Sequence, residues 1–206
     1  MFTLAHISDV HLAPMPAPEL RHLLGKRLTG FVSWHVFGRK KGHRRDTLDA
    51  LITDLKTRVF DHLALTGDLV NIALPQEFEA SAPWVADLGG PGNVSFVPGN
   101  HDIYRPVSAP GGIATWGPYM RSNPAGEKFA ASLSQGAAAG FPYVRVLDNI
   151  ALIGVSSAIP TLPFIAAGEL GEAQRSALVQ TLKNLDGTDL CRVLLIHHPP
   201  LPGLAV

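Results

Sequence analysis

Carboxylate, imidazole and amide side chains follow several apolar runs of this sequence, at the point where each run ends. Asp9 and His11 come after the first run, and Asp68 comes after the second. The string Gly99–Asp102, with the sequence GNHD, follows a third run, and His197 stands at the end of a later one. Polar groups are costly to bury without partners, so their repeated placement at the ends of apolar runs indicates one shared polar site.

The types of these side chains favour a metal centre. They offer carboxylate and imidazole donors together with the amide oxygen of Asn100, and no cysteine thiolate. Such donors suit Mn²⁺, Fe, Zn²⁺ or Co²⁺ rather than a cysteine-based zinc site. The groups suffice for two ions that share a carboxylate. Two ions about 3.5–4 Å apart can hold a nucleophilic hydroxide and neutralise phosphoryl oxygens, which is the chemistry of phosphate-ester hydrolysis.

A fold must bring these distant segments together. Apolar runs of strand length alternate with helical patterns along the chain, which predicts a layered α/β fold. Parallel strands of an open sheet end along one edge, and ligands bind at that edge. Gly67 and Gly99 would let the chain turn sharply after their strands.

The expected elements follow from apolar spacing. We expect strands at Phe2–Ser8, His62–Gly67, Val94–Gly99, Tyr143–Asp148, Ile150–Ser157 and Arg192–His198. A tight turn at Asn149 predicts a hairpin and therefore mixed strand directions. We expect helices over Pro75–Leu88, over Glu172–Leu185 with Ala173, Leu178, Leu182 and Leu185 inward, and after a cap at Asp46 with Leu48, Leu51, Ile52, Leu55 and Val59 inward.

The length and composition indicate a single globular domain without disulfide bonds. Its 206 residues fit one domain spanning 1–206. Cys191 is the single cysteine, so no internal disulfide can form, and we expect it to be a small buried apolar side chain in a reducing compartment. The N-terminus lacks the basic and long apolar regions of a signal peptide, and no apolar run reaches 18 residues. We therefore expect a cytoplasmic protein.

The net charge is zero, yet the charges are unevenly spread. Residues 20–45 hold eight of the seventeen lysines and arginines and no acidic residue, interleaved with leucines, phenylalanines and a tryptophan. One interpretation is an insert that packs some apolar side chains on the body and leaves its charges in water. The other is an amphipathic flap above the site that grips an anionic, partly apolar substrate or contacts an anionic membrane surface.

The motif set Asp9-x-His11, Gly67-Asp68, Gly99–Asp102 and His197 resembles that of the calcineurin-like metallophosphoesterase family, along essentially the whole chain. The resemblance implies a four-layer α/β/β/α sandwich of two mixed sheets with two divalent metal ions at the strand ends. It implies that Asp9 and His11 bind the first ion, that Asp68 bridges, and that Asn100 and His197 bind the second.

The resemblance also implies roles for residues that do not bind metal. His101 would face the substrate and protonate the leaving oxygen or stabilise the phosphoryl group. Asp102 would lie behind His101 and fix its orientation. His198 is not expected to be a ligand, because adjacent residues at a strand end point in different directions. His6, within the first strand, is expected to be structural.

The sequence departs from the family pattern in one respect. The family pattern ends in a Gly-His-x-His string that supplies one ligand to each ion, and this string does not occur in the 206 residues. We expect either a fragment of a longer protein or a naturally shortened form, and the fragment is favoured because the sequence ends in PPLPGLAV. In both cases the last strands would be missing, and we expect weak metal binding and low activity from this polypeptide.

The expected substrate is a small phosphate ester, either a phosphomonoester or a phosphodiester. Cyclic nucleotides and a nucleotide diphosphate linked to a lipid remain alternatives, since relatives in the family cleave each. Nucleic acid is not expected as a partner, because no recognisable reading module accompanies the basic residues. The non-catalytic alternative is a scaffold that keeps the fold and binds a partner. The oligomeric state does not follow from the sequence.

Overall fold

The computed structural model describes residues 1–23, 25–36, 42–104, 112–136, 138–162 and 165–201. Its first sheet contains β1 (Leu4–Ile7), β2 (His62–Thr66) and β3 (Val94–Val97) in that order, all parallel. The register pairs Leu4 with His62 and Leu63 with Val94. Parallel pairing brings the carboxyl ends of these strands to the same edge, as the sequence predicts.

The second sheet has mixed strand directions. It contains β4 (Tyr143–Leu147), β5 (Ile150–Gly154) and β6 (Cys191–Leu195), with β4 antiparallel and β6 parallel to β5. The two residues between β4 and β5 form the expected hairpin turn, in which Asp148 has a φ of 52°. The strands of both sheets begin within two residues of the predicted runs and end within three residues of them.

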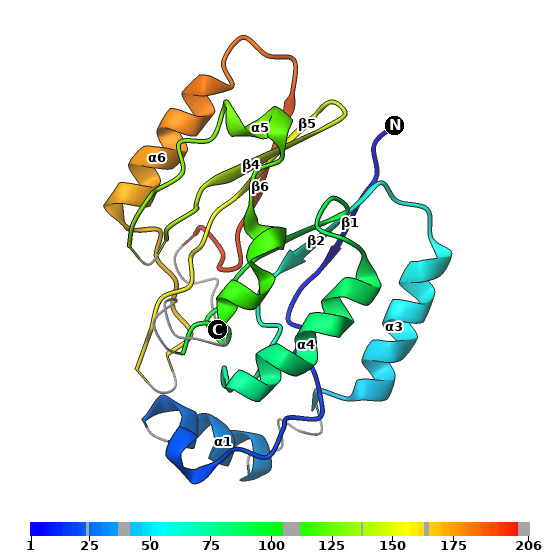
Figure 1. Cartoon of the computed structure of the whole chain (residues 1–206), viewed down its shortest axis with the longest axis vertical. Coiled ribbons are helices and arrows are strands. Elements are labelled where there is room, and N and C mark those ends of the chain that lie inside the picture. Colours follow the sequence, from blue (N-terminus) through cyan, green and yellow to red (C-terminus); the bar gives the residue numbers. More distant parts are fainter. Residues whose placement is uncertain (24, 37–41, 105–111, 137, 163–164, 202–206) are drawn as a thin grey trace.

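Helices cover the outer faces of both sheets, which gives the predicted four-layer sandwich. α3 (Arg45–Thr57) and α4 (Pro75–Leu88) lie beside the first sheet, and α6 (Gly171–Asn184) lies on the far side of the second (Figure 1). The described residues also include the short helical segments η1 (Leu20–His22), η2 (Ile113–Met120) and α5 (Pro124–Glu127). None of the helices among the described residues is both long and apolar enough to cross a bilayer.

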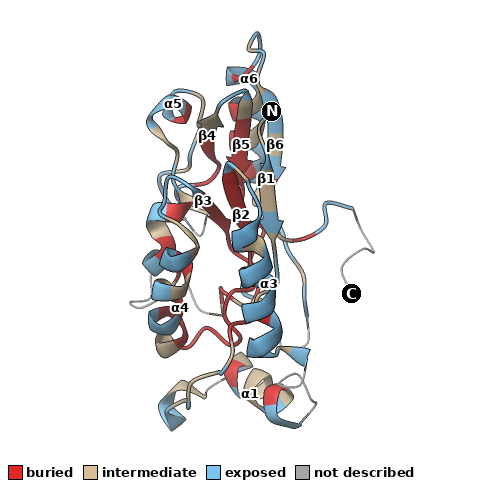
Figure 2. Ribbon diagram, turned by 90° about the vertical axis from the view of Figure 1, so that its right-hand side faces the viewer, coloured by how far each residue is buried: buried red, intermediate tan, exposed pale blue. Residues whose placement is uncertain are grey.

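The core lies between the two sheets and beneath the flanking helices. Ala64 and Val97 of the first sheet pack with Tyr143 and Leu152 of the second, and all four are fully buried. Figure 2 shows that burial extends beyond β2 into the segment that follows it. Residues 62–74 are buried without interruption, so the polar side chains in this segment are held in a rigid and largely dry environment.

Arg145 on β4 fixes the second sheet to its surroundings. Its buried guanidinium donates to the carbonyl oxygens of Arg121 at 2.9 Å, Pro118 at 3.1 Å and Val94 at 3.0 Å, and also to that of Pro91. Five donors in a planar fork allow one side chain to satisfy carbonyls from several separate segments.

Several local predictions are wrong in detail. Asp46 lies in the first turn of α3 rather than at its cap, which is Arg44. Leu51 and Val59 are exposed because α3 buries only one narrow face, with Leu48 and Ile52, and ends before Val59. Ala173 is also exposed.

Cys191 is another correction, because it is exposed rather than buried. It begins β6, which pairs only with β5 among the described strands, and the neighbouring Arg192 is exposed as well. An apolar run at the side of a sheet thus does not guarantee burial of its first residue.

The basic segment 20–45 forms α1 (Lys26–Val36) below the strand ends (Figure 1). Arg27 is buried and donates to the carbonyl oxygen of Ile72 at 3.1 Å and to that of Ala73, so α1 is attached to the segment after β2. Leu28, Val32 and Val36 are exposed on another side of the helix. Leu24 and residues 37–41, which include three of the eight basic side chains, lie outside the described residues.

Candidate metal centre

Asp68 stands at the centre of the polar site. It follows Gly67 at the end of β2 and is buried, with a φ of 54°. Its Oδ2 lies 3.7 Å from Nε2 of His11 and 3.7 Å from Nε2 of His197. These distances exceed a hydrogen bond. They suit donor atoms that share a cation, because donors about 2.0–2.2 Å from one ion lie roughly 3–4 Å apart.

Two groups of potential metal ligands share the Asp68 carboxylate. His11, Asp68 and His101 form one group, and Asp9, Asp68 and His197 form the other, with the ligand atoms of each within 4.8 Å of one another. Carboxylate and imidazole donors fit divalent transition metals, so the chemistry of the set agrees with the implied cofactor. Asp9 falls in the group with His197, and the expected sharing of one ion by Asp9 and His11 stays a prediction.

Backbone hydrogen bonds extend from the first sheet into these loops and place the ligands. The N–H of Asp9 donates to the Gly67 carbonyl at 3.1 Å, and the N–H of His11 donates to that of Asp68 at 2.8 Å. Asp9, His11 and Asp68 all have a positive φ, between 43° and 55°. Such a backbone is uncommon for residues other than glycine, and strained positions of this kind cluster at functional sites.

The carboxylate of Asp102 binds backbone N–H groups and not the imidazole of His101. We expected it to orient His101, but its carboxylate accepts the backbone N–H groups of Asp68 and Gly99 at 2.8 Å, of Leu69 at 2.9 Å and of Val70 at 3.2 Å. Burial, followed by the neighbouring Asp68 carboxylate, raises the pKa of Asp102 to about 7. Asp102 therefore holds together the loops after β2 and β3.

The imidazole of His101 is oriented by other groups. Its Nδ1 lies 2.5 Å from the carbonyl oxygen of Asn71 and 3.1 Å from the hydroxyl of Tyr104. A carbonyl can only accept, so Nδ1 carries a proton, and Nε2 is the ring atom suited to a metal or a substrate. The backbone N–H of His101 also donates to Oδ1 of Asp68 at 2.8 Å.

His197 and His198 point to different hydrogen-bond partners. Nδ1 of His197 donates to the carbonyl oxygen of Thr66 at 2.7 Å, which leaves Nε2 for the site, as in many metal-binding histidines. His198 turns away to Ser157, whose hydroxyl lies 2.8 Å from Nδ1. Burial, then His197, lowers the pKa of His198 to about 4. His6 is structural, since its Nε2 lies 2.7 Å from the hydroxyl of Thr66.

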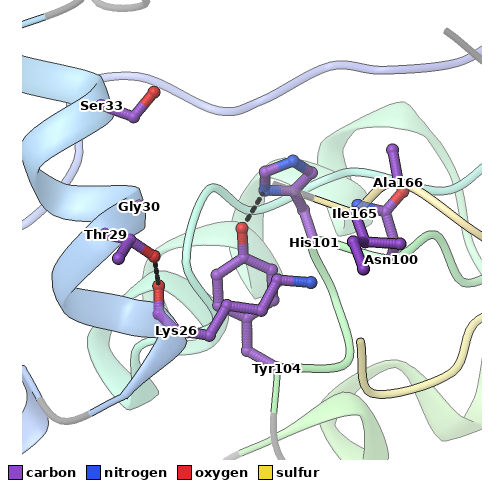
Figure 3. A pocket seen from close by; sticks show the side chains of 9 residues that line it. All are labelled: Lys26, Thr29, Gly30, Ser33, Asn100, His101, Tyr104, Ile165 and Ala166. Carbon is purple, nitrogen blue, oxygen red and sulfur yellow. Dashed lines mark hydrogen bonds between the residues drawn. The ribbon is translucent and has the colours of Figure 1, made fainter. Parts of the chain in front are cut away.

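A pocket opens beside His101. Lys26, Thr29 and Ser33 on one face of α1 line it together with Asn100, His101 and Tyr104, and its volume is about 280 Å³ (Figure 3). Asn100, predicted as a ligand, is buried at this pocket next to His101. The basic segment therefore forms one wall of the candidate site.

Four contributors to the site lie outside the sequence motifs, and of these only Lys26 was anticipated, as a basic residue of the segment that could form a flap above the site. They are Lys26, Asn71, Tyr104 and His43. The ring centroid of His43 lies 4.3 Å from that of His11, and the ring is stacked on Trp34 at 5.9 Å. Tyr104 stands two residues after the GNHD string and could have been noticed, whereas the particular α1 residues that line the pocket could not be chosen from the sequence.

The comparison with known families agrees with this geometry. A family model described as calcineurin-like phosphoesterase matches residues 2–203. A search of the curated proteins found none that matches the chain. Members of this family use divalent metal ions, and the two ligand groups around Asp68 are consistent with that chemistry. Because the family model covers almost the entire sequence, the chain belongs to the calcineurin-like phosphoesterases.

Proposed function

We propose that the protein hydrolyses a small phosphate ester, a phosphomonoester or a phosphodiester, with two divalent metal ions. The observation that carries the proposal is that Asp68 belongs to both groups of potential ligands. His11 and His101 would join it at one ion, and Asp9 and His197 at the other. Asn100, buried beside His101, would complete the set. Manganese, iron, zinc and cobalt all suit these donors.

When bound, the ions would supply Lewis acidity and activation of a water nucleophile. The chain's own residues would position the ester and manage protons. His101, whose Nδ1 proton is fixed by Asn71, would present Nε2 to the phosphoryl group or to the leaving oxygen. As a metal ligand Nε2 of His101 would be unprotonated, whereas as a proton donor it would carry a second ring proton besides the one on Nδ1, so the two roles exclude each other.

The test compares Asp68→Ala with Asp49→Ala, an exposed aspartate of α3. Both variants and the parent are assayed with Mn²⁺ on p-nitrophenyl phosphate, bis(p-nitrophenyl) phosphate and cyclic AMP. Asp68→Ala should lose at least a hundredfold in kcat/KM on whichever ester the parent hydrolyses, while Asp49→Ala keeps the parent rate. Equal rates for the parent and Asp68→Ala would contradict the proposal. Absence of hydrolysis by the parent on every ester would agree both with the scaffold alternative and with the low activity expected without the Gly-His-x-His string.

A second proposal concerns the outer face of α1, which we propose contacts an anionic membrane surface. Leu28, Val32 and Val36 recur every four residues and are 48%, 38% and 70% exposed, and Leu20 before the helix is 87% exposed. The segment also carries an excess of positive charge. Exposed apolar side chains with basic neighbours are typical of peripheral membrane helices.

Flotation with phosphatidylserine and phosphatidylcholine vesicles at low salt tests the membrane proposal. The parent should float with the anionic vesicles, and Leu28→Ser combined with Val32→Ser should not. Leu201→Ser, at another exposed leucine, is the matched control and should still float. Failure of the parent to float, or flotation of the double variant, would overturn the proposal.

A further inference from the structure

Lys26 occupies an unusual position for a lysine. Its ammonium lies 4.6 Å from the centroid of the Tyr104 ring, and it donates to the hydroxyl of Thr161. Figure 3 shows the side chain crossing the Tyr104 ring inside the pocket. No carboxylate oxygen among the described residues lies within 4 Å of this ammonium, whereas the ammonium of Lys56, for comparison, lies 2.6 Å from Oδ2 of Asp87.

The energetics of this position favour an anionic ligand. Partial burial lowers the pKa of Lys26, and the charge of Asp68 only partly opposes that effect. A half-buried ammonium loses part of its hydration, and the contacts of Lys26 with the Thr161 hydroxyl and the Tyr104 ring leave its charge without an opposite charge beside it. An anion that enters the pocket would place a negative charge beside the Lys26 ammonium. The Tyr104 ring already favours a cation over its face, which keeps the ammonium in place without neutralising it.

The helix that carries Lys26 is held at a fixed distance from the metal centre. Arg27 ties α1 to the carbonyl oxygens of Ile72 and Ala73. Gly30 faces Ile72 so closely that a β-carbon there would overlap the Ile72 side chain. Thr29 and Ser33 lie one and two turns along the same face and add hydroxyl groups to the pocket wall. The pocket is therefore built by a docked helix rather than by a loose segment.

The pocket also lies next to His101 and therefore next to the ligand groups around Asp68. Tyr104 links it to His101 through the 3.1 Å contact between its hydroxyl and Nδ1. Because His101 belongs to a ligand group around Asp68, a phosphoryl group held at that centre would have the pocket next to it. A volume of about 280 Å³ suits one part of a substrate rather than a whole large ligand.

We propose that this pocket holds the leaving group of the phosphate ester and that Lys26 binds an anionic substituent, a carboxylate or a second phosphoryl group, on that leaving group. The inference rests on the proposed phosphoesterase function. It narrows the substrate class to esters whose leaving group is itself negatively charged.

The kinetic test uses two esters that differ in charge and hardly in shape, 4-carboxyphenyl phosphate and 4-carbamoylphenyl phosphate. With Mn²⁺, the parent should prefer the carboxylate by about tenfold in kcat/KM, and Lys26→Met should abolish the preference. Lys26→Arg should keep most of it. Lys183→Met, which removes an exposed positive charge on α6, should leave it unchanged. No preference in the parent, or an equal loss on both esters in Lys26→Met, would overturn the inference.

A binding measurement separates this inference from the proposed function. Calorimetry on the metal-free protein compares 4-hydroxybenzoate with 4-hydroxybenzamide, the two leaving groups alone. Selective binding of the benzoate that Lys26→Met removes would support the pocket even if neither ester is hydrolysed. Equal binding of both compounds, or binding that Lys26→Met does not change, would overturn the inference whatever the enzyme assays show.

Discussion

The carboxylate of Asp102 accepts the backbone N–H of Asp68 at 2.8 Å, and the same oxygen accepts that of Gly99 at the same distance. One buried side chain thereby joins the loops after β2 and β3. It also contributes to the left-handed backbone at Asp68, whose φ is 54°. The contact sets where the shared carboxylate of the site can lie.

We expect Asp102→Asn to destabilise the fold by about 3 kcal/mol. An amide has one acceptor oxygen in place of two, so its NH₂ group would face backbone donors that lose their partner. Urea unfolding with a chelator present measures this change. The exposed Asp87→Asn, whose parent side chain pairs with Lys56 at the surface, should stay within about 0.5 kcal/mol. A similar loss in both variants would contradict the assignment.

Gly99→Ala should weaken Mn²⁺ binding by at least about tenfold. A β-carbon at Gly99 would overlap Oδ1 and the backbone nitrogen of Asp68, so the shared carboxylate must shift. Such a shift changes the ligand distances, to which metal affinity is sensitive. Calorimetric titration with Mn²⁺ provides the readout.

The matched control for this substitution is Gly90→Ala. Nothing lies within 4 Å of a β-carbon at Gly90, and its φ is not in the left-handed region. Its Mn²⁺ affinity should equal that of the parent. If Gly99→Ala binds as tightly as Gly90→Ala, the Asp68 carboxylate is not the shared ligand.

Arg145→Lys should cost about 3 kcal/mol in the free energy of unfolding, even though it preserves the charge. A single ammonium cannot reach the carbonyl oxygens of Val94, Pro118 and Arg121 that the guanidinium serves together, so buried acceptors lose partners. Thermal or urea unfolding measures the loss. Arg175→Lys on the exposed face of α6 should be nearly neutral, and comparable stability of the two variants would refute the explanation.

Protonation linked to His62 should lower the free energy of unfolding by about 2 kcal/mol between pH 7 and pH 5. Burial, then the nearby Arg145, lowers the pKa of His62 from 6.5 to about 4. The unfolded chain therefore takes up its proton first as the pH falls, so acid favours unfolding through this group. Urea unfolding at pH 7, 6 and 5 should show a shallower pH slope in His62→Asn.

The exposed His35→Asn is the control for the pH series and should keep the parent slope. Because His62 contacts Ser95 through its Nε2 at 2.8 Å, His62→Asn is expected to lower stability at pH 7 as well. The slope, not the absolute stability, is the informative quantity. An unchanged slope in His62→Asn would mean that other groups govern the acid sensitivity.

Most of the fold could be predicted from the apolar runs of the sequence and from the polar residues that separate them. Each predicted strand exists, because short runs bounded by Gly, Asp and Asn leave few other ways to bury apolar surface. The convergence of Asp9, Asp68 and His197 followed from the parallel pairing of the strands of the first sheet and from the packing of the second sheet against it. These features depend on local pattern together with simple topological rules.

Other features depend on contacts that no local pattern encodes. The task of Asp102 could not be read from its place after His101, because its partners are backbone amides up to 34 residues away. Lys26 lies on a helix whose docking is decided by Arg27 and Gly30 against the segment after β2. The exposure of Cys191 reflects its place in the sheet, which apolar spacing alone does not reveal.

One of the two ligand groups, Asp9, Asp68 and His197, draws on both halves of the sandwich. Asp68 follows β2 of the first sheet. His197 follows β6 of the second sheet, and its Nδ1 donates a hydrogen bond to the carbonyl oxygen of Thr66 in the first. A cation held by both side chains would cross-link the two sheets at one end. Folding and metal binding would then be thermodynamically linked, so the melting temperature of the protein would rise with the concentration of free metal.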